Sequence, residues 1–302
     1  MKTMYAFILS IMMLGAVVAI AKPALVISDS ARSFLQNSNP IDSLAESFVA
    51  TIDESSDNSL TELKNLLSST YKVYGFRNKS FRIRKENVAF DLSALETNRA
   101  NTAHQMLEQL LPQGYVNQFK LVSIDVQRSF AMSQGVQIEG YTFNFKRVFN
   151  NRIVRNNKNY LIVRTDKNGI LKNAEIALQK LTVSSEQIAI GADYNEKVAT
   201  LDSMINVGYE FIEVFDENRQ LKSVKLEKIE VGSVAHSYCE VGIESERMLF
   251  SEKKLFPCLS YASKLVLPNK DEIGGIIDAP YSRKSWSEFS KNGNVSFIIH
   301  RR

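Results

Sequence analysis

The stretch of the chain that says most about its fold is GYTFNFKRVFNNRIV, residues 140–154. From Tyr141 to Lys146 aromatic residues alternate with polar ones, and a period of two is typical of a β-strand with one buried face. The same period covers much of the sequence from Val116 to Leu181. Within it, Asp166-Lys167-Asn168-Gly169 has the composition of a tight turn between strands. We therefore expect an antiparallel sheet at the centre of the chain.

Apolar residues at helical spacing flank this central block. They predict helices over Asn39–Ile52, Leu60–Tyr71 and Leu95–Leu111, and helix-compatible spacing returns in residues 184–205. The last of the three named helices would end at Pro112. Together these patterns predict an α+β fold in which antiparallel sheets pack with helices.

The first 21 residues have the pattern of a signal peptide. Lys2 precedes an apolar run from Met4 to Val18, and Ala19-Ile20-Ala21 is a small-x-small cleavage site. No later apolar run approaches the roughly 20 residues of a membrane-spanning helix. We therefore expect an exported protein, periplasmic or secreted, that is cleaved near Ala21 and has no transmembrane segment in its mature chain.

The mature chain divides into three regions by pattern. Residues 22–115 predict a helical and mixed N-terminal region, residues 116–205 an α+β unit, and residues 206–302 a β-rich region. The last region contains both cysteines, Cys239 and Cys258. In an oxidising compartment an isolated pair favours one disulfide. By closing a loop of this length, the bond would stabilise the folded chain by about 3 kcal/mol. Two separate buried thiols are the alternative.

The sequence contains no motif that predicts catalysis or a cofactor. Its histidines are His104, His236 and His300, so the paired histidines of a zinc peptidase are missing. His236 and Cys239 could be read as two metal ligands, but a zinc site needs three or four. The same two residues could form a nucleophilic pair, but Cys258 competes for Cys239. We therefore predict no catalytic residues, no metal site and no cofactor.

Basic residues form two groups in which they alternate with aromatic and apolar ones. Six of them are our candidate binding residues: Arg82, Arg84, Lys146, Arg147, Arg152 and Arg155. Alternation along a strand would place such charges on one face, where they could contact an acidic protein or an anionic envelope surface. A solvated sheet face without a partner is the alternative. Nucleic acid is not an expected partner, because an exported chain seldom meets it.

The central block resembles the core hairpin of PepSY-like domains. Arg147, Asn150, Arg152 and Val154 fit the pattern R-x-x-N-G-x-x-V, with Asn151 in place of the turn glycine. Asn accepts left-handed backbone conformations better than most residues. The turn at residues 166–169 fits the second turn of such domains, and residues 130–136 are similar to the F-x-Q-x-x-G-V segment of thermolysin-type propeptides.

This resemblance implies a central PepSY-like unit in residues 116–205, built from a small antiparallel sheet and a helix. It also implies an exported domain that binds or inhibits peptidases or acts as an interaction module, with no catalytic residues. Our prediction is therefore a non-catalytic binding module, such as a peptidase inhibitor or an envelope interaction protein, whose partner is another exported or envelope protein or an anionic envelope surface. The alternatives are an extracytoplasmic enzyme with a site assembled from distant carboxylates, and a structural component of a surface assembly.

Overall fold

The computed structural model describes residues 22–37, 48–53, 58–77, 80–131, 135–156, 158–187, 191–208, 211–215, 221–241 and 253–282. The predicted signal peptide lies outside these residues. In the described part of the chain, thirteen strands form one mixed sheet in the order β10-β2-β14-β13-β7-β6-β8-β9-β4-β3. Three further pairings attach β1 to β13, β15 to β14 and β5 to β6, and β11 pairs separately with β12.

The bounds of the elements are as follows. The helices are α2 (Asp29–Asn37), α3 (Asn58–Ser68), α4 (Arg99–Leu110), α5 (Gln113–Val116) and α6 (Tyr194–Gly208). The strands are β1 (Ala24–Ile27), β2 (Phe48–Asp53), β3 (Lys72–Arg77), β4 (Ser80–Arg84), β5 (Phe119–Ala131), β6 (Gly135–Phe149), β7 (Arg152–Arg155), β8 (Tyr160–Asp166), β9 (Leu171–Ala177), β10 (Lys180–Gln187), β11 (Phe211–Phe215), β12 (Leu221–Lys225), β13 (Lys228–Val241), β14 (Lys253–Val266) and β15 (Glu272–Ala279).

The predicted α+β class, with antiparallel sheets packed with helices around a central PepSY-like sheet-and-helix unit, is wrong. The chain is mostly β, and its main sheet is mixed because β13 pairs in parallel with both β1 and β7. β13 and β14 also pair with each other along most of their length. Among the described strands, each of these two has three partners, so they join into one sheet strands that we predicted in separate regions.

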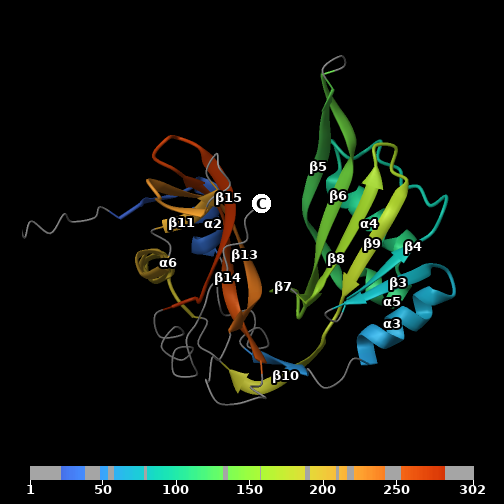
Figure 1. Ribbon diagram of the computed structural model, residues 1–302. Helices are drawn as coiled ribbons and strands as arrows, with labels where there is room; N and C mark the ends of the chain where they lie inside the picture. The colour runs from blue at the N-terminus through green and yellow to red at the C-terminus, as the bar shows by residue number, and fades with distance from the viewer. Residues whose placement is uncertain are drawn as a thin grey trace, which may run out of the picture.

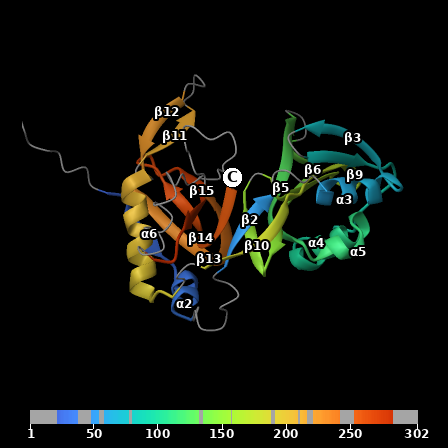
Figure 2. The same cartoon turned by 90° about the horizontal axis from the view of Figure 1, so that it is seen from below.

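One part of the molecule, which we call the central lobe, comprises the described residues of 58–149 and 160–178. Its strands carry apolar side chains on one face, where α3, α4 and α5 cover them (Figure 2). Phe143 and Phe145 of β6 are buried there, while the polar residues between them point to the other face. The predicted alternation of the opening stretch is thus confirmed for β6.

The second part, the terminal lobe, comprises the described residues of 22–37, 191–208, 221–234 and 259–282. Its core lies between the strands β1, β13, β14 and β15 and the helices α2 and α6. The two lobes are joined through β2, β7 and β10 and the ends of β13 and β14 (Figure 1). A third apolar cluster fills this junction and consists of Ala50, Ile52, Val154, Leu181, Tyr238 and Leu255.

Local expectations had mixed outcomes. The helices over residues 60–71 and 95–111 are confirmed in outline as α3 and α4. The helix over Asn39–Ile52 is wrong in its second half, because residues 48–53 form β2, and its first half lies outside the described residues. Asn150 and Asn151 both adopt positive φ in the turn between β6 and β7, which confirms that Asn151 can replace a turn glycine. None of the described helices is both long and apolar enough to cross a membrane.

Candidate functional site

Two of the six candidate basic residues lie on the exposed side of β4. Arg82 donates to the Glu175 carboxylate of β9 at 2.8 Å, across neighbouring strands. Arg84 is two residues further along and is also exposed. This ion pair neutralises Arg82, and an exposed pair of this kind contributes little to stability.

Lys146 and Arg147 lie at the lower end of β6 and are both mostly buried. Lys146 donates to the Asn156 carbonyl oxygen at 2.7 Å, and burial, with repulsion by Arg155, lowers its pKa to about 8. Arg147 donates to the Gln179 carbonyl oxygen, and burial lowers the pKa of Arg147 to about 10. Because they are adjacent in a strand, these two side chains leave the sheet on opposite faces.

Arg152 and Arg155 come from the short strand β7 at the junction. Arg152 is only 1% exposed and donates to the Tyr281 hydroxyl at 2.6 Å. Its guanidinium also lies over the rings of Tyr238 and Tyr281. Arg155 is half-buried. The structure thus brings Lys146, Arg152 and Arg155 to the junction, leaves Arg82 and Arg84 on the central lobe, and does not unite all six on one face.

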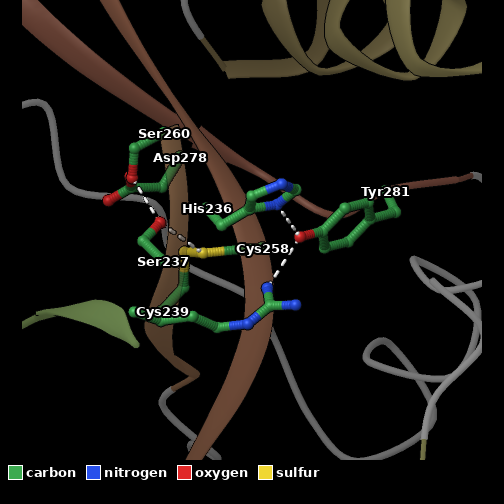
Figure 3. The surroundings of a disulfide bond; sticks show 8 residues. His236, Ser237, Cys239, Cys258, Ser260, Asp278 and Tyr281 are labelled. Atoms are coloured by element: carbon green, nitrogen blue, oxygen red, sulfur yellow. Dashed lines mark hydrogen bonds between the residues drawn. A yellow bond between two sulfur atoms is a disulfide. The ribbon is translucent and has the colours of Figure 1, made fainter. Parts of the chain in front are cut away.

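The predicted disulfide forms in this same junction. Cys239 of β13 and Cys258 of β14 are bonded, with Cα atoms 6.0 Å apart (Figure 3). The register sets Ser237 opposite Cys258, so the two cysteines occupy diagonal positions on paired strands. Both sulfur atoms are buried in the junction, where Ser237 contacts the Cys258 sulfur at 3.2 Å.

A buried polar chain continues from the disulfide. The hydroxyls of Ser237 and Ser260 are 2.5 Å apart, and Ser260 donates to the Asp278 carboxylate (Figure 3). The Asp278 carboxylate lies close enough to both sulfur atoms to suggest three metal ligands. A cysteine binds a metal as a thiolate, however, and both sulfurs are already bonded to each other. All three polar side chains are buried, so this cluster offers a substrate no access.

A second polar group lies on the other side of the disulfide. His236 Nδ1 is 2.5 Å from the Tyr281 hydroxyl, which also accepts from Arg152 (Figure 3). The ring of His236 also lies beside that of Phe34 from α2. Tyr281 therefore links β7 and β13 to the segment that follows β15. We infer that His236, Tyr281 and Arg152 together hold the two lobes in contact.

Burial controls the ionisation of Asp278. It raises the pKa of the Asp278 carboxyl above the ordinary value of 3.8, against the opposing effects of the Ser260 hydroxyl and the cations of Arg155 and Lys146. A carboxyl whose pKa is higher in the folded chain stabilises the fold below its unfolded pKa. That stabilisation is lost as the pH rises through the folded pKa.

The wild-type chain should lose stability as the pH rises above about 4, because the buried Asp278 carboxyl must then ionise. We expect Asp278→Asn, which has no carboxyl at this position, to lack this loss. The free energy of unfolding, measured by urea titration at several pH values, should fall with rising pH more steeply for the wild-type chain than for the variant. Asp271→Asn is the matched control, because Asp271 is exposed. Parallel pH profiles for the wild-type chain and Asp278→Asn would contradict this expectation.

The most exposed apolar surface of the described chain lies elsewhere, at the end of the hairpin formed by β5 and β6. Phe130 is 74% exposed and Val136, its partner across the hairpin, is 65% exposed. Ile138 pairs with Arg128, and Val126 pairs with Tyr141. By strand alternation these side chains share one face. We call Val126, Arg128, Phe130, Val136 and Ile138 the tip face.

The tip face continues the covered face of the central lobe. Ile124 and Tyr141, lower in the same hairpin, pack against the apolar core beneath α3 and α4. Above them the two strands extend past the other strands of the lobe (Figure 1). The apolar stripe of the hairpin therefore begins in the core and ends in solvent.

The opposite face of the hairpin is polar and internally bonded. Ser129 donates to Glu139 at 2.6 Å, Gln127 donates to Thr142, and Asn144 donates to Asp125. Sequence reasoning missed the tip face, although the alternation of Ile124, Val126 and Phe130 with polar residues was visible. What it could not show is that the helices end below the tip of the hairpin.

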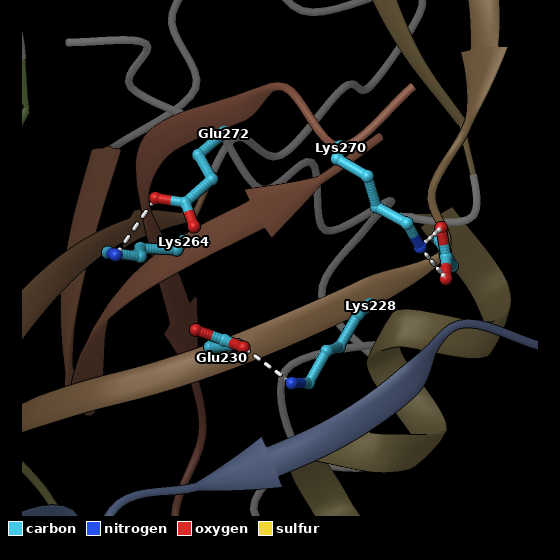
Figure 4. A network of polar contacts seen from close by, with 6 residues as sticks. Lys228, Glu230, Lys264, Lys270 and Glu272 are labelled. Atoms are coloured by element: carbon cyan, nitrogen blue, oxygen red, sulfur yellow. Dashed lines mark hydrogen bonds and ion pairs between the residues drawn. The ribbon is translucent and has the colours of Figure 1, made fainter. Parts of the chain in front are cut away.

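A pocket of about 570 Å³ lies in the terminal lobe, lined by residues in and next to β1, β13, β14 and β15. Its lining includes Val26, Gly232 and Gly274, together with the charged residues Glu230, Lys264 and Glu272. These charges are paired with one another: Lys264 with Glu272, Lys228 with Glu230, and, beside the pocket, Lys270 with Glu227 (Figure 4). Because these charges are paired within the protein, we assign the pocket no ionic ligand.

No family model matches this sequence, and no curated protein matches it. The resemblance to PepSY-like domains therefore stays a prediction.

Proposed function

We propose that the chain is an exported protein-binding module that holds a partner polypeptide on the tip face of the β5–β6 hairpin. The observation that carries this proposal is the exposure of Phe130 and Val136, two large apolar side chains that face each other across a projecting hairpin. Exposed apolar patches with a polar surround are characteristic of interaction sites.

Export is proposed on two features of the sequence. Residues 1–21 have the pattern of a cleavable signal, and Cys239 and Cys258 form the kind of disulfide that persists in oxidising compartments. The partner would then be another exported or envelope protein. A peptidase is the partner class that the PepSY-like resemblance implies, so inhibition of a peptidase is the more specific version of this prediction.

The exposed tip face supports a binding function more strongly than the buried polar groups of the junction support a catalytic one. The carboxylate, hydroxyl and histidine groups that come together are those of Asp278, Ser260, Ser237 and His236, and they bond to protein groups inside the sheet. The tip face, in contrast, presents aromatic and aliphatic side chains to solvent. Such residues, once buried in a complex, dominate the affinity of protein interfaces.

We expect Phe130→Ser to weaken partner binding by at least about tenfold, because truncating a buried aromatic anchor costs an interface more than about 1.4 kcal/mol. A photoreactive phenylalanine analogue at position 130 in the native organism would capture the partner for identification. The purified partner is then titrated against the wild-type chain and the variant.

Ile170→Ser is the matched control for this experiment. Ile170 is also a large exposed apolar residue of the central lobe, 44% exposed, but it lies in the turn between β8 and β9. The control variant should bind as the wild-type chain does, and both variants should unfold at the wild-type urea concentration. Equal binding by Phe130→Ser and the wild-type chain would refute the proposed function.

A further inference from the structure

The outer edge of β5 is unpaired in the described part of the chain. β5 is an edge strand whose only strand partner there is β6. Over residues 123–130, no hydrogen bond from the described residues reaches the backbone groups on the far side from β6. Alternate residues of a strand present their N–H and C=O groups to opposite neighbours, so this edge offers a regular row of donors and acceptors.

This edge lacks most of the features that block strand addition. Residues 123–130 read SIDVQRSF, without proline, glycine or lysine. The opposite edge of the central lobe is different: β3 carries Lys72, has Gly75 at positive φ, and shifts its register between Tyr74 and Arg77. Proteins use lysines, bulges and local twists of this kind to prevent pairing at edges. Within residues 123–130 the register with β6 also shifts, between Gln127 and Arg128, but the extra residue there is Glu139 of β6 and not a residue of β5. The outer half of β5 is therefore the more regular edge of the two.

Arg128 gives this edge a chemical preference. It lies on the tip face between Val126 and Phe130, and its side chain has no ion pair or hydrogen bond among the described residues. The acids of the hairpin, Asp125 and Glu139, are bonded to Asn144 and Ser129. A cation among apolar side chains favours a partner that brings a carboxylate and discourages partners that bring only apolar groups.

The same residue argues against a second copy of this chain as the occupant. In a two-fold pairing of β5 with β5, the tip-face side of the strand would meet Ile124, Val126, Arg128 and Phe130 of the other copy. None of these is acidic, so Arg128 would lie opposite an apolar residue or another arginine. A different polypeptide can supply the missing carboxylate.

We propose that the partner binds by adding an extended segment as a strand along the outer edge of β5. The segment places apolar side chains at alternate positions on the tip face and an aspartate or glutamate beside Arg128. This inference rests on the proposed function and specifies its binding mode. Backbone hydrogen bonds would supply affinity, and the alternate side chains would supply selectivity.

The probe for the test is a displayed library of short random peptides, selected on the full-length, disulfide-bonded chain. We expect the retained sequences to share apolar residues at every second position and one acid in the same phase. In a synthetic copy of the best peptide, N-methylation removes one backbone donor at a time. Methylation of the residues whose N–H groups face β5, which are every second residue, should weaken binding by at least about tenfold. Methylation of the residues between these should have little effect.

A charge exchange tests the role of Arg128. Arg128→Glu should bind the acidic peptide at least about tenfold more weakly than the wild-type chain does, and a peptide with lysine in place of the acid should prefer the variant. Gln127→Glu is the matched control, because Gln127 points to the opposite face of the same strand. Its affinity for the acidic peptide should change less than that of Arg128→Glu.

The outcomes separate this inference from the proposed function. Binding that requires Phe130 but tolerates N-methylation at every position would overturn strand addition and leave the binding surface intact. Selection of no peptide whose retention depends on Phe130 would overturn the inference as well. A dimer of the free chain that Phe130→Ser dissociates would identify a second copy as the occupant and would also overturn it.

Discussion

Replacing Cys239 and Cys258 together by alanine is expected to lower the free energy of unfolding by about 3 kcal/mol. The disulfide closes a loop with a sequence separation of 19, and its loss gives the unfolded chain more conformations. It also ties β13 to β14 at the level where β7 pairs with β13. Urea unfolding of the double variant and the wild-type chain under oxidising conditions measures the difference.

The control is the wild-type chain after reduction. If the covalent bond is the source of the effect, a reducing agent should destabilise the wild-type chain by a similar amount and leave the double variant unchanged. A difference below about 1 kcal/mol between the oxidised wild-type chain and the double variant would contradict the entropic argument. It would indicate that strand pairing alone fixes the junction.

Short-range features of this fold could be predicted from the sequence. The aromatic alternation from Tyr141 to Lys146 correctly predicted a strand, because side chains on a strand alternate between its faces. The turn before Leu171 was also correct: Asp166 accepts hydrogen bonds from the backbone of Asn168 and Ile170, and Gly169 adopts a positive φ. In each case the residues that determine the structure are neighbours in the chain.

The errors came from contacts between distant segments. Phe48 and Ile52 have helical spacing, yet they lie in a strand that pairs with both β10 and β14. Nothing within residues 39–52 reveals these two partners. The parallel pairing of β7 with β13 likewise joins residues more than eighty positions apart, and it is one of the pairings that make the sheet mixed.

The tip face was missed, and the burial of Arg152 was not expected, for a related reason. Arg152 has the charge of a surface residue, but the turn at Asn150 and Asn151 folds β7 back into the junction, where Tyr281 and Tyr238 receive the guanidinium. Phe130, in contrast, has the character of a core residue. It is exposed because the hairpin is longer than the helix layer that covers its base.

Gly140→Ala is expected to destabilise the chain by about 3 kcal/mol, the upper end of the usual cost of overpacking. A Cβ atom at this position would lie 2.2 Å from the backbone oxygen of Thr165 in β8. Because the obstacle is backbone, it cannot rotate away, and β8 must separate from β6 to make room. Gly140 is the first residue of β6 to pair with β8, so the separation would open the sheet at its end.

Gly232→Ala is the matched control, because Gly232 also lies within a long strand but its added Cβ would meet only the Ala262 oxygen, at 3.7 Å. Urea unfolding should show a change within about 1 kcal/mol for the control, and equal effects of the two substitutions would contradict the contact argument. Gly140 also lies next to Glu139, the residue at which the register of the hairpin shifts. A side chain here would therefore alter the course of the hairpin above it, so Gly140→Ala should weaken partner binding even at temperatures where the variant is fully folded.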